Sequence, residues 1–146
     1  LAKEKLSQAL QRLTVLKVIE TRDVGSGYEV VFSTSEVFAP VTSELTPDAK
    51  SEWKFLAQFI KTEIGSMNVS IESHTDSNPL KNKKKFASNW ELSGSRAIQS
   101  VRTFEEAGFS SDSLQGVGFG SSRPLTPRAP ASPAGDSRRI ILRLSN

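Results

Sequence analysis

One acidic residue and one arginine stand where their side chains could jointly hold a doubly charged ligand. Asp76 follows residues 68–74, whose alternating pattern is typical of a strand, and Arg96 lies two turns into a helix predicted to begin at residue 88. An acid at a strand end and a guanidinium on the next helix suit a zwitterion, since Asp76 can accept from an ammonium group and Arg96 can bind a carboxylate. A structural salt bridge that pins the loop to the helix explains the same spacing, and the sequence leaves both interpretations open.

Catalytic and metal-binding chemistry has little support. The chain has no Cys and a single His, His74, which excludes disulfides, thiolate nucleophiles and multi-His metal sites within one chain. A Ser-His-Asp triad would have to use His74, but Ser73 points to the opposite face of the strand, and no G-x-S-x-G elbow occurs. We therefore predict no enzymatic activity, no catalytic residue, no metal site and no cofactor, and we expect His74 to be a hydrogen-bonded structural residue.

The positive charge is concentrated in the second half of the chain. The 146 residues have a net charge of +3, but residues 1–80 hold 8 basic and 11 acidic side chains, whereas residues 81–146 hold 11 and 5. The run of lysines at 81–85 is either a solvated basic surface or a contact for an anionic partner. It lacks interleaved aromatic residues apart from Phe86, and no nucleic-acid-binding motif occurs, so we predict no nucleic-acid partner.

Helical and strand patterns alternate along the chain, and they must position these residues. Leucines at helical spacing predict an amphipathic helix over residues 2–21, Thr46-Pro47 opens a second helix, and Ser88 with Glu91 forms a capping box for a third that stops at Gly108. Strands are predicted over residues 28–33, 68–74, 114–119 and 138–144, with a loop over residues 120–137. Trp53 and Trp90 both fall on apolar helix stripes and are expected in the core.

This order predicts an α+β fold. We expect a two-layer sandwich in which a mixed four-stranded sheet has helices on one face, in the order β-α-β-α-β-β, preceded by the N-terminal amphipathic helix. Residues 1–25 are then a linker helix and residues 26–146 the domain. The sequence contains no apolar run near the ~18–20 residues of a membrane helix. Because it begins with Leu1 rather than Met, we expect a preceding segment and its anchor to be missing.

Four motifs in order resemble the OmpA-like peptidoglycan-binding domains. Residues 73–76, Ser-His-Thr-Asp, are similar to the family's G-H-T-D strand end, and residues 92–101 to its L-S-x-x-R-A-x-x-V helix. Residues 116–124 resemble its G-x-G-x-x-x-P turn, and residues 137–140 its N-R-R-V strand entry. Within the family, residues 88–93 and the long loop before them look most like the periplasmic domains of flagellar stator subunits of the MotB type.

The resemblance implies a role for individual residues. It implies that Asp76 and Arg96 grip the diaminopimelate of the peptidoglycan stem peptide, and that Asn89 contacts the peptide. Of the arginine pair, it implies a binding role for Arg138 rather than Arg139. The sequence departs from the family where Ser73 replaces Gly, where Ser137 replaces Asn, and where Ala39 stands in place of an Asp after Phe38.

The resemblance also implies a cellular context. The chain would be the periplasmic domain of a single-pass inner-membrane protein, a homodimer that anchors the stator ion channel to the cell wall for torque generation. A MotA-type subunit would be its partner through the missing transmembrane helix. An anchor domain of an outer-membrane OmpA or lipoprotein-type protein is the alternative with the same fold. A cell-wall hydrolase is a third possibility, against which the absence of convincingly paired catalytic carboxylates speaks.

Overall fold

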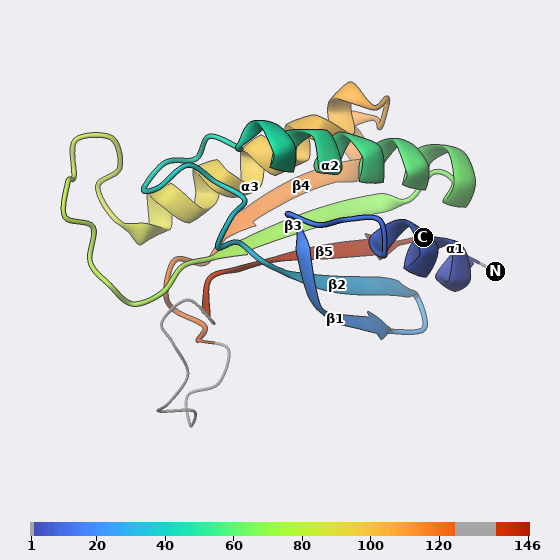
Figure 1. Ribbon diagram of the computed structural model, residues 1–146, viewed down its shortest axis with the longest axis horizontal. Coiled ribbons are helices and arrows are strands. Elements are labelled where there is room, and N and C mark those ends of the chain that lie inside the picture. The colour runs from blue at the N-terminus through green and yellow to red at the C-terminus, as the bar shows by residue number, and fades with distance from the viewer. Residues whose placement is uncertain (1, 125–136) are drawn as a thin grey trace.

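The strands form one mixed five-stranded sheet in the order β1-β2-β5-β3-β4 in the computed structural model (Figure 1). The structure describes residues 2–124 and 137–146. The strands are β1 (Lys17–Asp23), β2 (Gly27–Ser33), β3 (Asn68–His74), β4 (Leu114–Gly118) and β5 (Arg139–Ser145). Strands β3 and β4 are parallel, and the other neighbouring pairs are antiparallel. Since β3 and β5 are antiparallel, β3 ends at His74 opposite Arg139, where β5 begins, and the predicted site residues Asp76 and Arg138 lie next to this end of the two strands.

The long helices cover one face of the sheet, as Figure 1 shows. They are α2 (Pro47–Phe59), which continues as the π-helical turn η1 (Ile60–Ile64), and α3 (Asn89–Glu106). The shorter helix α1 (Ala2–Leu10) packs against η1 and α2, and a short 3-10 turn, η2 (Ser111–Ser113), precedes β4. Trp53 of α2 is fully buried between Phe32 and Phe104, at ring-centroid distances of 5.3 and 6.0 Å. This edge-to-face packing joins the sheet to both helices, so that α3 is held in a fixed position over β3 and β4.

Local sequence signals explain where the helices begin. The side chain of Thr46 accepts from the Ala49 backbone N–H, and Pro47 occupies the first turn of α2. At α3 the Ser88 hydroxyl accepts from the Trp90 backbone N–H and donates to the Glu91 carboxylate. The predicted capping box is therefore confirmed, and it fixes the start of the helix that carries Arg96.

The predicted fold class is confirmed, with two corrections at the N-terminus. The helix predicted over residues 2–21 ends at Leu10, and residues 17–23 form the edge strand β1, so the sheet has five strands rather than four. β-Branched residues follow one another in this segment and favour a strand, which then pairs with β2. The predicted boundary between residues 25 and 26 falls in the turn that joins β1 to β2 and stays a prediction. Most of the predicted loop over residues 120–137 lies outside the described residues.

Glu52 of α2 binds the backbone of the segment that follows α1. The Glu52 carboxylate accepts hydrogen bonds from the backbone N–H groups of Thr14, Val15 and Leu16, at 2.9 to 3.1 Å. Burial raises the pKa of Glu52, but the N–H groups of Leu16, Thr14 and Val15 stabilise the carboxylate and leave its pKa below the ordinary value. Glu52 thus holds the chain in the extended path that leads into β1.

Replacing Glu52 with Gln is expected to lower the free energy of unfolding by roughly 1–2 kcal/mol at pH 7, because hydrogen bonds to a charged acceptor are lost. A lowered pKa stabilises the fold above the unfolded value of 4.5 and loses this effect as pH falls through the folded value, so the difference from the parent should shrink below that pH. Denaturant unfolding from pH 3 to 7 measures the difference in stability and its dependence on pH. Glu63→Gln is the control, since this exposed side chain makes no hydrogen bond or ion pair within the described ranges. An equal effect of both variants would contradict the role of Glu52.

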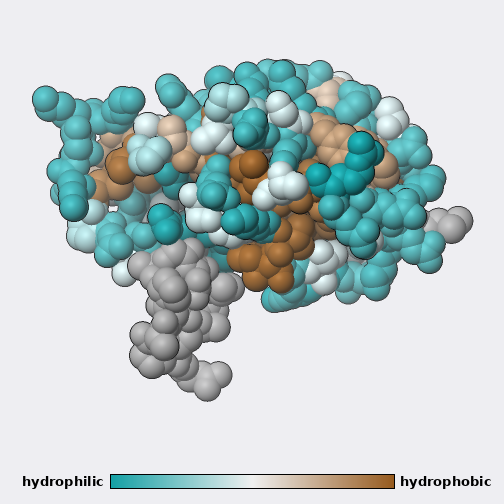
Figure 2. All heavy atoms as spheres, viewed as in Figure 1, coloured by the Kyte–Doolittle hydropathy of each residue, from teal (hydrophilic) through white to brown (hydrophobic). Residues whose placement is uncertain are grey.

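The two tryptophans differ in burial. Trp53 is 0% exposed, as expected, whereas Trp90 is 56% exposed, so its predicted place in the core is wrong. Figure 1 shows the reason: α3 begins beyond the end of β4, where the sheet does not cover its first turn. Figure 2, drawn from the same side as Figure 1, shows a mainly hydrophilic surface with a hydrophobic area below α2. The predicted site residues meet at this same end of the molecule, next to the uncovered start of α3.

Candidate ligand-binding site

The four predicted site residues line one pocket beyond the end of β3. The pocket has a volume of about 630 Å³, within the range of roughly 300–1,000 Å³ typical of ligand sites. Asp76, Asn89, Arg96 and Arg138 all contribute to its wall. Residues Pro40, Val41 and Thr42, from the segment between β2 and α2, form another part of the wall, and the loop between β3 and α3 contributes the rest. Four elements distant in sequence therefore meet around one space.

Arg96 is held so that its outer nitrogens remain available. Its side chain is 9% exposed, its Nε donates to the Thr42 carbonyl at 2.8 Å, and its guanidinium carbon lies 4.7 Å from the centroid of the Phe38 ring. Within the described part of the chain, no hydrogen bond uses Nη1 or Nη2. The guanidinium is thus fixed by its inner nitrogen and can present its outer edge to a carboxylate.

The surroundings of Arg96 lower its pKa without removing its charge at neutral pH. Burial has the largest effect, the nearby positive charge of Arg138 acts in the same direction, and the Asp76 carboxylate opposes both, which leaves the pKa at about 10. A buried arginine that is short of a charged partner gains most from an incoming carboxylate.

Asp76 faces the same pocket and is only loosely paired. Its Oδ2 lies 3.7 Å from Nε of Arg138, which is too long for a hydrogen bond, and its Oδ1 accepts from the Asn78 backbone N–H at 3.0 Å. No ion pair joins Asp76 to Arg96 within residues 2–124 and 137–146. The salt-bridge interpretation of this pair is therefore wrong, and an open pocket lies between an anionic and a cationic group.

Asn89 contributes to the pocket mainly by holding the loop after β3. Its Nδ2 donates to the Asn78 carbonyl at 3.0 Å and, more weakly, to the Asp76 carbonyl at 3.4 Å. Asn89 is also the first residue of α3, where the backbone N–H groups add a partial positive charge. Its side chain thus couples the start of α3 to the strand end that carries Asp76.

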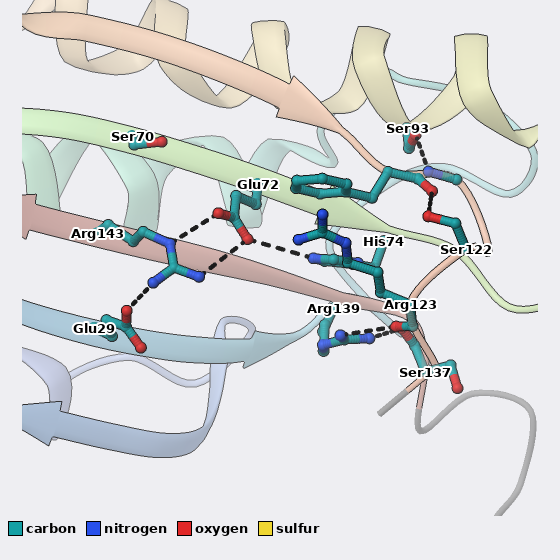
Figure 3. A network of polar contacts seen from close by, with 12 residues as sticks. Glu29, Ser70, Glu72, His74, Ser93, Ser122, Arg123, Ser137, Arg139 and Arg143 are labelled. Atoms are coloured by element: carbon teal, nitrogen blue, oxygen red, sulfur yellow. Dashed lines mark hydrogen bonds and ion pairs between the residues drawn. The ribbon is translucent and has the colours of Figure 1, made fainter. Parts of the chain in front are cut away.

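The two neighbouring arginines at the start of β5, Arg138 just before the strand and Arg139 as its first residue, have separate roles. Arg138 lines the pocket, whereas Arg139 is 6% exposed and does not. Arg139 donates from Nη1 to the Ser137 carbonyl and from Nη2 to the Arg123 carbonyl, both at 2.9 Å (Figure 3). Burial lowers the pKa of Arg139, and the Glu72 carboxylate partly offsets this. Arg139 therefore joins two backbone segments and leaves the pocket to Arg138.

A second charged cluster lies on the sheet face opposite the helices, and its members pair with one another. Arg143 lies between Glu29 and Glu72 and forms ion pairs with both, while Nε2 of His74 is 3.6 Å from Oε2 of Glu72 (Figure 3). His74 is 2% exposed and stacks on Phe119 at 5.1 Å, but neither ring nitrogen has a hydrogen-bond partner in the described residues. His74 was predicted to be a hydrogen-bonded structural residue; it is buried, but the predicted hydrogen bond is absent among the described residues.

The described residues contain neither a candidate metal site nor a candidate membrane-spanning helix. Residues 2–124 and 137–146 contain no group of three or more Asp, Glu or His side chains placed to hold a metal ion. None of the helices that the structure describes is long and apolar enough to cross a membrane.

Sequence patterns missed several residues of the pocket. Phe38 and Thr42, which hold Arg96, lie more than 50 positions before it, and no local pattern links them to it. Val41 has a φ of 56°, an uncommon left-handed conformation for a β-branched residue, and lines the pocket beside Thr42. Lys81 and Lys85 also line it, and their only signal in the sequence was the lysine run.

Comparisons with known proteins agree on the fold. The model of the OmpA family matches residues 37–138. A MotB-like protein from Desulfovibrio vulgaris is 22% identical, with a TM-score of 0.82 over 99% of this chain and 94% of that chain. The cell wall anchor of the T6SS from Pseudomonas aeruginosa is 18% identical, with a TM-score of 0.80 over 99% and 96%. The periplasmic domain of Helicobacter pylori MotB is 19% identical, with a TM-score of 0.72 over 86% and 78%. No curated protein sequence matches the chain.

Proposed function

Since this chain belongs to the OmpA family, which covers residues 37–138, we propose that it is a non-catalytic module that binds the stem peptide of peptidoglycan. The zwitterionic end of diaminopimelate is the ligand group. Asp76 accepts from its ammonium group, and Arg96 binds its carboxylate through Nη1 and Nη2. Asn89 keeps the loop after β3 in place, and Arg138 adds positive charge beside Asp76.

A single observation carries this proposal: an acid and a buried arginine line one open pocket without forming an ion pair with each other. A buried guanidinium with two unused nitrogens is costly unless a ligand supplies the missing anion. The loose contact between Asp76 and Arg138 leaves the carboxylate able to accept an ammonium group. A ligand whose ammonium and carboxylate groups are attached to the same carbon can contact Asp76 and Arg96 at once.

For the cellular role, we propose the periplasmic domain of a flagellar stator subunit of the MotB type. The domain would act as a homodimer, anchor the stator to the cell wall, and belong to a single-pass inner-membrane protein with a MotA-type partner. The likeness of residues 88–93 to that type supports the proposal. The structural relatives support only the shared fold, because they include a MotB-like protein and a cell wall anchor at similar identity. An outer-membrane OmpA or lipoprotein-type anchor is the alternative, and a membrane helix, a barrel or a lipidation signal elsewhere in the full-length protein would distinguish them.

Co-sedimentation with purified sacculi tests the binding proposal. The protein is expected to sediment with sacculi that contain diaminopimelate and to be released by free diaminopimelate. Nα-acetyl-lysine amide is the matched competitor, because it keeps a side-chain ammonium group and has no free carboxylate, so it should release much less protein. Folded protein that stays in the supernatant would overturn the proposal. Soluble fragments released from the sacculi would instead indicate a hydrolase.

A further inference from the structure

We propose that Lys81 and Lys85 form a second anion-binding subsite in the same pocket, which binds a further free carboxylate of the stem peptide. This inference rests on the proposed function and adds a preference to it. The pocket would bind a peptide with one ammonium group and at least two carboxylates more tightly than the same peptide with one carboxylate amidated.

The charge of the pocket exceeds what a zwitterion can neutralise. Its described lining holds one carboxylate, that of Asp76, and four cationic side chains: Lys81, Lys85, Arg96 and Arg138. Asp76 lies beside Arg138, and the ion pairs of the described residues include none with Lys81, Lys85 or Arg96. One ammonium and one carboxylate add no net charge, so positive charge remains after the first contacts are made. A ligand with additional negative charge would neutralise the remaining positive charge of the pocket.

The loop directs these two lysines, and not the whole run, toward the pocket. Lys81 and Lys85 line it, whereas Lys83 lines a smaller pocket beside Trp90, and Lys84 does not contribute to the ligand pocket. Within the loop, the Lys84 backbone N–H donates to Oδ1 of Asn82 at 2.9 Å. Asn89 holds the earlier part of the loop at Asn78. Only Lys81 and Lys85 of the lysine run therefore line the ligand pocket.

The size of the pocket fits more than one amino acid. Its volume of about 630 Å³ exceeds the space that a single diaminopimelate needs, so the pocket has room for neighbouring residues of the peptide. In the stem peptide, the glutamate linked to diaminopimelate through its side chain carries a free α-carboxylate. Conversion of this group to the primary amide removes its charge and keeps its shape, so the two forms differ in the contact that we assign to Lys81 and Lys85.

Isothermal titration with two synthetic peptides tests this assignment. One peptide is N-acetyl-γ-glutamyl-diaminopimelate with a free glutamate α-carboxylate, and the other carries the α-carboxamide. The parent protein is expected to bind the free acid about 3- to 10-fold more tightly, as for charge contacts that are partly exposed. The Lys81→Gln/Lys85→Gln variant should bind both peptides with the parent's affinity for the amide. Lys84→Gln, a matched change in the same loop, should keep the preference.

The outcomes separate this inference from the proposed function. Equal affinity of the parent for the two peptides, or a preference that persists in the double variant, would overturn the second subsite and leave the diaminopimelate site intact. Failure of the parent to bind either peptide would overturn the proposed function and this inference with it. Because the loop is exposed, the double variant should unfold at the same denaturant concentration as the parent, which excludes misfolding as the cause of a lost preference.

Discussion

Arg96→Gln and Asp76→Asn should each remove most binding to peptidoglycan while the fold remains. Each change takes away one member of a charged contact with the ligand, which typically costs roughly 2–5 kcal/mol. Affinity should therefore fall by about 30-fold to several thousandfold. Asn at position 76 can still accept from the Asn78 backbone N–H, so its effect reports the charge and not the shape of the loop.

Arg96→Lys is expected to bind nearly as poorly as Arg96→Gln. Lysine keeps a positive charge but cannot form two parallel hydrogen bonds with a carboxylate, and it loses the Nε contact to the Thr42 carbonyl. Co-sedimentation with sacculi and titration with diaminopimelate measure both variants. Arg102→Gln provides the control, since Arg102 is an exposed residue on the same helix. If the Asp76 and Arg96 variants stay folded and sediment like the parent, the site assignment fails.

The largest loss of stability is expected from Gly118→Ala, where β4 touches α3. A Cβ at Gly118 would lie 2.2 Å from the Gly94 backbone nitrogen and 2.6 Å from Oγ of Ser93. These contacts are with helix backbone and a buried hydroxyl, so the helix itself would have to move. We expect the free energy of unfolding to fall by roughly 2–4 kcal/mol, as for overpacked cores.

The same substitution should also impair the site. Oγ of Ser93 accepts from the Gly120 backbone N–H at 2.8 Å, and a shift of α3 would break this contact and displace Arg96 on the same helix. Gly94→Ala is the matched control. Nothing lies within 4 Å of its added Cβ, and alanine in a helix interior should increase stability by about 0.5–1 kcal/mol. Denaturant unfolding of both variants measures the difference, and equal stabilities would contradict the close contact between β4 and α3.

Short-range patterns were sufficient for most elements of the fold. The alternation over residues 68–74 predicted β3 with the bounds observed, and the pair Ser88 and Glu91 located the start of α3. Both signals depend on residues that are close together in the sequence. They can therefore be interpreted without knowing which other segments pack against them in the fold. Their positions in the predicted elements indicated Asp76 and Arg96, the family motifs added Asn89 and Arg138, and the structure brings all four to one pocket.

The N-terminal segment was misinterpreted because its conformation depends on distant partners. Leucines at helical spacing continue past Leu10, but the chain turns away where Glu52, more than 35 positions later, binds three backbone N–H groups. The strand β1 then exists because β2 offers it a partner. Local periodicity describes which face of a segment is apolar, and it does not say whether a neighbouring strand is present to pair with it.

By itself the sequence determined the order of the elements from residue 28 onward, the candidate residues Asp76, Asn89, Arg96 and Arg138, and the helix that carries Arg96. Only the tertiary structure decided that Arg96 is held by Phe38 and Thr42, that it makes no ion pair with Asp76, and that Lys81 and Lys85 face the pocket while Lys84 does not. The reason is that helix caps and strand alternation arise from neighbours along the chain, whereas burial, ion pairing and the direction of a loop side chain arise from residues that only folding brings together.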